Sequence, residues 1–327
     1  MTKIAIIGAG LSGLSVAYLL KDYAEITIFE KASGVSGRMC TWSAKPYFFD
    51  HGAQYFTVRT KAFQDFIHPL INYGLIECWN ANYIKFDGDT ITESSNWSTD
   101  EPRYVGVPGM NTITRYLSEG SDVHLNTRIT SLIKEDTWIL SDENCQLYND
   151  FDWVISTVPA PQATEILPSK FKYHSEIKAV QMRACFALML GFSKRLPLEF
   201  GAAYVNNSDL SWISVNSQKP GRTDQFSLIV HSSNKYAEKH FDDDRKVVMQ
   251  HLCDETSSII GHDVGIADYK NIHGWRYANN VNRENCTIFL DHHLKLAACG
   301  DWCLGGRVEG AFNSAYMLSN EMKKSTL

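Results

Sequence analysis

The sequence has no excess of positive charge, because its 31 Lys and Arg residues are outnumbered by 37 Asp and Glu, for a formal net charge of −6. Proteins that bind nucleic acid through its phosphates need a basic face, so this balance argues against such a partner. Internal repeats, low-complexity tracts and hydrophobic runs of transmembrane length are also lacking. We therefore expect a globular protein with neither a nucleic-acid nor a membrane partner. Its oligomeric state stays open.

Metal-binding patterns of cysteine and histidine are missing as well. The eight cysteines include no C-x-x-C pair, and Cys299 and Cys303, four residues apart, make no zinc signature by themselves. The eleven histidines show no H-E-x-x-H spacing. We therefore expect no metal site. Since no secretory signal is recognisable, the cysteines are predicted to be reduced, buried thiols of a cytoplasmic protein.

The longest stretch without charge near the N-terminus runs from Ile4 to Leu20. A secretory signal would end in a small-residue cleavage site, and none follows this stretch. A membrane span needs roughly 20 mostly apolar residues. This stretch is shorter and contains Gly8, Gly10 and Gly13. Secretion and membrane insertion are therefore the weaker explanations.

A strand, a glycine-rich turn and a helix explain the same stretch better. Residues 3–7 are a short apolar run suited to a buried parallel strand, and residues 14–20 have helical periodicity. Residues 25–29 form a second predicted strand that ends at Glu30. The glycines between them have the G-x-G-x-x-G spacing that is typical of dinucleotide-binding turns.

Each glycine has a separate physical role in such a turn. Gly8 permits the tight turn after the strand, Gly10 lets the backbone approach a pyrophosphate, and Gly13 lets the helix pack closely on the sheet. The helix N-terminus offers unpaired N–H groups and a partial positive charge to the phosphates. Glu30 is placed to accept hydrogen bonds from ribose hydroxyls. The sequence therefore predicts a dinucleotide cofactor.

The remainder of the chain shows two kinds of pattern. Residues 122–158 predict a small meander and a second buried strand, and the chain after residue 289 predicts a strand, a glycine-rich turn and a helix from about Val308. Residues 183–233 contain successive strands without helices between them, which predicts an antiparallel sheet covered by a helix over 242–260. A chain of this length suggests two domains, with the nucleotide domain assembled discontinuously.

These segments together resemble the FAD-containing amine-oxidase superfamily, and more closely its renalase-like branch of small flavoproteins. The motifs that support the resemblance span nearly the whole chain: GAGLSG, SGRM, DHGAQYF, STVPAPQ, KPGR, LIVHSS, HGWRYA and CGDWCLGGRVEGAFNSA. The resemblance implies an α/β fold with two domains. A Rossmann-type (glutathione-reductase-like) FAD-binding domain would comprise residues 1–75, 105–165 and 280–327. A substrate domain with a mainly antiparallel sheet and covering helices would comprise residues 76–104 and 166–279.

The resemblance also implies which residues bind FAD. The Ser12 backbone and Glu30 would hold the pyrophosphate and the adenosine ribose, Arg38 would contact phosphate, and Asp301 would bind a ribityl hydroxyl. Ala53 and Gln54 would lie by the flavin ring, the Ile129 backbone would meet adenine, and Val308 would face the pyrimidine edge of the flavin. The full expected set is Gly8, Gly10, Ser12, Gly13, Glu30, Lys31, Arg38, Ala53, Gln54, Ile129, Gly300, Asp301 and Val308.

Three features depart from the family pattern. Ser36 stands where a second glycine often precedes the arginine, which reduces the freedom of the loop. No cysteine stands near HGWRYA, where many amine oxidases attach FAD, so we expect non-covalent FAD. Arg307 stands where amine oxidases place an aromatic-cage tyrosine. A guanidinium beside the flavin would repel a protonated amine and suit an anionic or carbonyl-bearing substrate. Alternatively, Arg307 pairs with Glu309 or Asp301 and turns away.

The renalase-like resemblance implies an FAD-dependent oxidase that takes hydride from a dihydropyridine nucleotide, the 2- or 6-dihydro isomer of NAD(P)H. The products would be NAD(P)+ and, after electron transfer to molecular oxygen, hydrogen peroxide. Such a donor releases hydride directly, so no nucleophile–base pair is required, and none is obvious in the sequence. The substrate-side residues would be Tyr55, His231, Trp275, Arg276 and Arg307. His231 and Trp275 could equally be packing residues.

Four other functions stay open at this point. A true amine oxidase would need an aromatic cage, and a carbon–carbon desaturase a larger apolar cavity. A flavin-binding sensor would bind FAD without turnover. An NAD-using Rossmann dehydrogenase would leave the second glycine-rich turn, at residues 300–310, unexplained.

Overall fold

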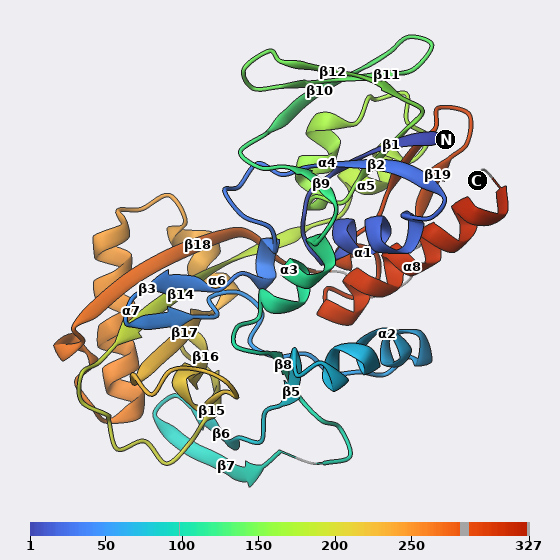
Figure 1. Cartoon of the computed structure of the whole chain (residues 1–327). Coiled ribbons are helices and arrows are strands. Elements are labelled where there is room, and N and C mark those ends of the chain that lie inside the picture. Colours follow the sequence, from blue (N-terminus) through green and yellow to red (C-terminus); the bar gives the residue numbers. More distant parts are fainter. Residues whose placement is uncertain (98, 282–287, 326–327) are drawn as a thin grey trace.

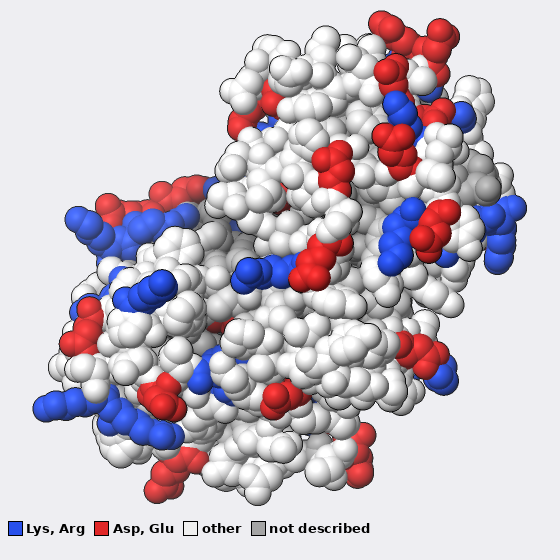
Figure 2. All heavy atoms as spheres, viewed as in Figure 1, with Lys and Arg blue, Asp and Glu red and all other residues white. Residues whose placement is uncertain are grey.

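The computed structural model describes residues 1–97, 99–281 and 288–325. They form two lobes, each built around one large sheet, and the first strand and the last helix of the chain both belong to the upper lobe (Figure 1). On the face shown in Figure 2, acidic and basic side chains are interspersed among uncharged ones. The helices of the described ranges include none with the length and apolar character needed to cross a bilayer.

The upper lobe contains a six-stranded sheet that is parallel except for one edge strand. In spatial order its strands are β19 (Phe289–Asp291), β20 (Leu296–Ala298), β13 (Trp153–Ser156), β1 (Thr2–Ile7), β2 (Ala24–Phe29) and β9 (Asp122–His124). Only β19 runs antiparallel to its neighbour. The apolar run of β1 is buried on both faces, as a central parallel strand requires.

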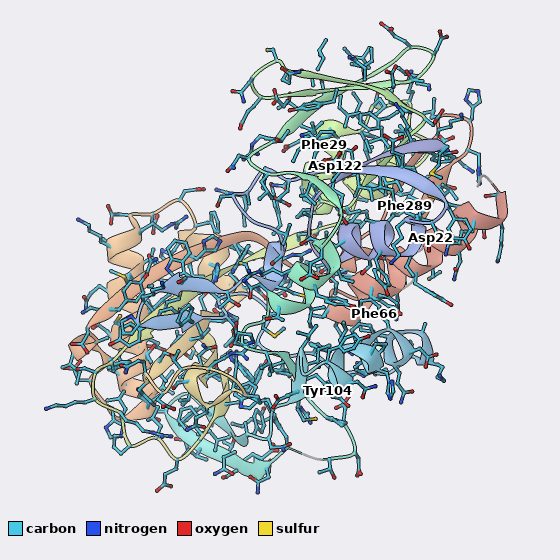
Figure 3. All side chains as sticks on the ribbon, in the orientation of Figure 1. Asp22, Phe29, Phe66, Tyr104, Asp122 and Phe289 are labelled. Carbon is cyan, nitrogen blue, oxygen red and sulfur yellow. The ribbon has the colours of Figure 1, made fainter. Side chains whose placement is uncertain are left out.

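Alternate residues of β1 belong to two different hydrophobic clusters, because successive side chains of a strand point to opposite faces. Ile4 and Ile6 pack with helices α1 (Leu11–Leu20) and α8 (Val308–Ser325). Ala5 and Ile7 pack beneath a meander of three strands and two short helices on the other face. These elements are β10 (Ile129–Lys134), β11 (Trp138–Asp142), β12 (Leu147–Phe151), α4 (Ala160–Ile166) and α5 (His174–Lys178). Phe29 and Phe289 belong to this second cluster (Figure 3).

The lower lobe contains a seven-stranded sheet that is antiparallel except between β15 and β6. Its spatial order is β18 (Tyr269–Asn280), β14 (Met182–Gly191), β17 (Ser227–Ser232), β16 (Leu210–Val215), β15 (Ala202–Asn206), β6 (Asn82–Asp87) and β7 (Thr90–Asn96). Helices α6 (Asn234–His240) and α7 (Arg245–Ile260) cover one face, where Phe186 and Leu188 are buried. The other face includes Ala187 and Met189, and Met189 packs on Tyr47 and Phe49.

Short segments of the N-terminal half connect the lobes. After β2 the chain forms a hairpin of β3 (Trp42–Ala44) and β4 (Tyr47–Phe49), and Phe49 packs on Met189 of the lower sheet. Helix α2 (Lys61–Asn72), strand β5 (Ile76–Cys78), its partner β8 (Tyr104–Gly106) and helix α3 (Thr112–Ser118) follow below the upper lobe (Figure 1). The hairpin places residues 50–55 against the uncovered face of the lower sheet.

The predicted α/β fold class is confirmed, with a parallel Rossmann-like sheet and a second, mainly antiparallel sheet. The strands of each large sheet fall within the segments expected for each domain, apart from the last residue of β18, and the domain boundaries themselves stay a prediction.

Asn111 occupies the N-cap position of α3, but its side chain makes no capping hydrogen bond because its backbone is already helical.

Helix α7 begins three residues later than the expected residue 242, at Arg245. Asp244 is its N-cap, and one carboxylate oxygen accepts the backbone N–H groups of Lys246 at 2.7 Å and Val247 at 3.4 Å. These bonds satisfy donors that the helix leaves unpaired at its first turn.

We expect Asp244→Ala to lower the free energy of unfolding by about 1 kcal/mol, because the first turn of α7 loses its cap. Asp244→Asn keeps an acceptor at the same place and should stay close to the wild type. Urea denaturation of the three proteins measures the difference. Equal stability of the alanine and asparagine variants would contradict this assignment of the cap.

Candidate active site

The glycine-rich turn between β1 and α1 is tightly built except at its middle glycine. Gly8 has a φ of +108°, and a Cβ on Gly13 would lie 2.0 Å from the Gly8 carbonyl oxygen. A Cβ on Gly10, by contrast, would meet no described atom within 4 Å. Helix α1 has neither a side-chain cap nor an acidic residue in its first turn. The turn therefore leaves open space and uncapped N–H groups where a pyrophosphate would bind.

Glu30 holds this turn in place. Its buried carboxylate accepts the backbone N–H groups of Ala9 and Ala32, each at 2.8 Å. Ile129 lies at the start of β10, and the preceding segment returns to Glu30 through a 2.8 Å bond from the Thr127 N–H. Glu30 and Ile129 are thus brought together, as the resemblance implied. Contacts to ribose and adenine stay a prediction for both.

Two other expected cofactor residues lie beside the turn. The Ser12 hydroxyl donates to the Ala311 carbonyl at 2.9 Å, which fastens α1 to α8. Lys31 is exposed next to Glu30. Gly300 and Val308 flank the second glycine-rich turn, Gly300 just before Asp301 and Val308 at the first residue of α8.

Ser36 adopts a backbone conformation that favours glycine, with a φ of 121°. Its N–H donates to the Ala9 carbonyl at 2.9 Å, and its hydroxyl accepts a 2.8 Å bond from Thr114. Serine therefore occupies the usual glycine position with the strain opposed by two hydrogen bonds.

The first and last glycine-rich segments meet in a bidentate ion pair. Arg38 donates from Nη1 to Asp301 Oδ2 at 2.9 Å and from Nη2 to Oδ1 at 2.5 Å, and Nη1 also reaches the Ala278 carbonyl at 3.1 Å. The residues expected at the phosphate and the ribityl chain are thus adjacent. Ala53 lies beside them, since its N–H donates to the Arg38 carbonyl at 2.8 Å.

Asp50, Lys219 and Arg222 form a buried charge cluster close to Ala53. Asp50 Oδ2 accepts from Arg222 Nη2 at 2.5 Å and from Lys219 Nζ at 3.3 Å, while Oδ1 accepts from Thr41 Oγ1 at 2.8 Å and the Met110 N–H at 3.0 Å. Burial alone would raise the pKa of Asp50, but Lys219 and Arg222 outweigh it and lower this pKa to about 2. The carboxylate is therefore ionised at neutral pH.

Gln54 connects the cluster to the face of the lower sheet that helices α6 and α7 do not cover. Its Oε1 accepts from Ser214 Oγ at 2.8 Å and Lys219 Nζ at 3.1 Å. Its Nε2 donates to the carbonyls of Asp50 and Gly52 and lies 3.5 Å from His231 Nε2. The structure thus brings together Gln54, expected at the flavin ring, and His231, expected at the substrate.

Aromatic rings and imidazoles form a wall next to Gln54. Trp275 donates from Nε1 to the His51 carbonyl at 2.9 Å and stacks on the His51 ring, with 5.2 Å between centroids. His273 lies edge-on to both rings. Burial, with His273 as a second cause, lowers the pKa of His51 to about 4, and burial with Lys219 lowers that of His231 to about 4. These two imidazoles are neutral at pH 7.

The same face of the lower sheet has a small residue between bulky ones. Trp212 is paired with His231, His231 with Ala187, and Ala187 with His273 across four adjacent strands. Paired residues share a face, so His231 and His273 flank the small side chain of Ala187 on this face. Tyr55 adds to the border of this row, with its ring centroid 5.7 Å from that of Trp212.

Arg276 is not brought to this wall. It follows Trp275 on a strand and so points to the opposite face. There it pairs with Asp242 at 2.6 Å and lies over the Phe241 ring. Its expected substrate contact has no support from its position.

Arg307 lies exposed in the turn before α8. The acids expected as alternative partners are engaged elsewhere: Asp301 binds Arg38, and Glu309 Oε1 accepts the N–H groups of Arg59 at 3.0 Å and Thr60 at 2.7 Å. Within the described ranges, Arg307 therefore has neither of these two acids as an ion-pair partner.

Sequence reasoning missed several residues of the site, namely Asp50, His51, Ser214, Lys219, Arg222 and His273. Asp50 and His51 belong to the recognised motif DHGAQYF, and Lys219 and Arg222 to KPGR. Those motifs located the residues but did not indicate which would be partners. Among the described residues, no group of three or more His, Cys, Asp or Glu could hold a metal ion.

Comparison with protein families agrees with this geometry. A model of an NAD(P)-binding Rossmann-like domain matches residues 6–70. A model of flavin containing amine oxidoreductases matches residues 80–322, well over half of the chain. The chain belongs to the flavin containing amine oxidoreductase family. It is an FAD-dependent oxidoreductase, and the predicted renalase-like character is confirmed at that level.

Individual relatives match over nearly the full length. The chain is 23% identical to renalase of Mus musculus over an alignment of 357 positions, which covers 99% of each protein. Among solved structures, a protein of Exiguobacterium sp. 255-15 provisionally named protoporphyrinogen oxidase has a TM-score of 0.80 at 12% identity. Putrescine oxidase bound to putrescine has a TM-score of 0.69 at 12% identity, and both matches cover 99% of each chain. The two structures show a shared fold.

The residues present fit FAD. The uncapped helix end and the open space above Gly10 suit its pyrophosphate, and the Arg38–Asp301 pair supplies the two side chains that the resemblance assigned to phosphate and ribityl contacts, which stay a prediction. The second glycine-rich turn, which a nicotinamide-only dehydrogenase left unexplained, adjoins the same pair.

Substituting the two glycines should separate fold from cofactor binding. We expect Gly13→Ala to lower both stability and FAD affinity, because its Cβ would collide with the Gly8 carbonyl. Gly10→Ala should keep the melting temperature of the FAD-free protein but weaken FAD binding, because its methyl group would enter the space needed by pyrophosphate. Quenching of flavin fluorescence measures affinity. Wild-type affinity of Gly10→Ala would refute this location of the pyrophosphate.

Removal of the Asp50 charge should destabilise the protein strongly. Asp50→Asn leaves Lys219 and Arg222 buried without a counter-charge, so we expect it to cost about 3–5 kcal/mol of unfolding free energy. Glu101→Gln removes an exposed partner of Arg59 and should cost less than about 1 kcal/mol. Denaturant unfolding of both variants tests the contrast, and similar costs would contradict it.

Proposed function

We propose that this FAD-dependent oxidoreductase is an oxidase of a dihydropyridine nucleotide, the 2- or 6-dihydro isomer of NAD(P)H, with NAD(P)+ and hydrogen peroxide as products. When bound, FAD would accept the hydride and pass the electrons to molecular oxygen. The observation that best supports the proposal is the wall of neutral rings made by His51, His273 and Trp275.

A flat, uncharged wall suits both the donor and the product of this reaction. The donor is a planar ring that gives up hydride without needing a base, and its product is a pyridinium cation. Neutral imidazoles do not repel that cation, and the face of Trp275 attracts it. The His51 carbonyl holds the Trp275 indole in one orientation through its 2.9 Å hydrogen bond. These residues would therefore orient the ring and exclude water from it.

Arg307 supports a nucleotide over an amine. An exposed guanidinium whose acidic neighbours are occupied attracts phosphate and repels an ammonium group. The full-length similarity to mouse renalase also favours this proposal, whereas the likeness to putrescine oxidase concerns the fold.

The decisive experiment is the visible spectrum of the FAD-loaded protein under anaerobic conditions. We expect the isomeric dihydro-NAD mixture to bleach the flavin band and a primary amine such as putrescine to leave it unchanged. Admission of air should then restore the band and yield hydrogen peroxide.

Three other results would decide against the proposal. Bleaching by the amine alone would indicate an amine oxidase. A spectrum unmoved by every donor would favour a flavin-binding sensor, and bleaching without reoxidation in air would exclude an oxidase. Ordinary 1,4-dihydro-NADH serves as the control for non-specific reduction.

A further inference from the structure

Lys219 is the second of two buried cations beside the Asp50 carboxylate. Its side chain has no exposed surface, and its ammonium lies 3.3 Å from Asp50 Oδ2, 3.1 Å from Gln54 Oε1 and over the ring of Trp79. Asp50 already has a 2.5 Å ion pair with Arg222. The cluster therefore buries two cations against one anion.

Such an excess charge is costly to bury. The cost is visible in the pKa of Lys219, which burial lowers to about 8 although Asp50 opposes this effect. An apolar residue of similar length could fill the same space and leave the Asp50–Arg222 pair intact. Besides helping to keep Asp50 ionised, the ammonium has a second partner, the Gln54 amide.

Gln54 shows what the ammonium does. A glutamine amide can be placed in two orientations that differ in which end carries the donors. With Lys219 and Ser214 both donating toward one end of the amide, that end must be the acceptor Oε1. The amide nitrogen then faces the carbonyls of Asp50 and Gly52 and, at 3.5 Å, His231 Nε2. The flipped orientation would point N–H groups at the ammonium.

We propose that Lys219 is a positioning residue of the active site, which locks the Gln54 amide in one orientation and through it fixes the placement of His231. The two N–H groups of the amide are directed at the carbonyls of Asp50 and Gly52, and the amide nitrogen lies 3.5 Å from His231 Nε2, so the position of the amide sets the position of the imidazole ring. The inference extends the proposed function, but it does not depend on which donor reduces the flavin.

The charged and titratable groups around His231 come from three other segments. Asp50 and His51 lie on the loop after the β3–β4 hairpin, and Lys219 follows β16. His273 lies on β18, separated from His231 by Ala187 of β14. The neighbouring positions on β14 and β16 are Ala187 and Trp212, which do not titrate. Lys219 is the charged group of this set that also contacts Gln54.

Histidine titration in the FAD-loaded protein tests the proposal directly. We would label histidine with ¹³C, identify the His231 signal by its loss in His231→Gln, and follow it by NMR against pH. In Lys219→Met, His231 should titrate at higher pH, by about one pH unit, because a nearby positive charge is lost and the amide beside the ring is no longer held in place. Lys219→Arg should restore the wild-type behaviour. Lys85→Met, at an exposed lysine of the same sheet, is the matched control.

A second variant guards against misfolding. Gln54→Leu leaves Lys219 and Asp50 in place but removes the amide, and it should move the titration of His231 in the same direction. An unmoved His231 signal in Lys219→Met, or in Gln54→Leu should the first variant fail to bind FAD, would overturn the proposal.

Flavin reduction gives the functional measurement. We expect Lys219→Met to slow anaerobic reduction about tenfold and to displace its pH profile, with FAD affinity unchanged, because the groups at the ring are misplaced. If no dihydropyridine reduces the wild type, the proposed function fails while the NMR titration still decides the role of Lys219. Wild-type rates and pH profile in Lys219→Met would argue against positioning.

Discussion

The buried carboxylate of Asp50 is the interaction on which the site depends most. An ionised group without solvent must be surrounded by donors, and the donors of Asp50 come from separate parts of the chain: Thr41, Met110, Lys219 and Arg222. The loop after β4, the start of α3 and the segment after β16 therefore have to converge. Gln54, four residues after Asp50, is placed against the lower sheet as a consequence.

The site is made by both lobes together. Arg38 and Asp301 join the first and last glycine-rich segments, while Trp275 of the lower sheet bonds to the His51 backbone of the connecting loop. The loop of residues 50–55 contacts both groups, because Ala53 bonds to the Arg38 carbonyl, His51 to Trp275 and Gln54 to Ser214.

Much of the fold could be predicted from local pattern. The glycine spacing at 8–13 indicated strand, turn and helix because backbone sterics act within a few residues, and Gly13 does lie against the Gly8 carbonyl. The expected helix over 242–260 was found with its start at Arg245, where Asp244 caps it. Strand alternation also explains why Trp275 and Arg276, both expected at the substrate, lie on opposite faces.

The sequence by itself determined the family, the FAD cofactor and the order of strands and helices, because motifs and periodicity depend on residues close together in the chain. Only the tertiary structure decided which groups became partners. Lys219 and Asp50 are separated by 169 positions, and Arg38 and Asp301 by 263. Ionic and hydrogen-bond energies depend on distances in space, and those distances exist only once both sheets have formed and the loop of Asp50 lies between them.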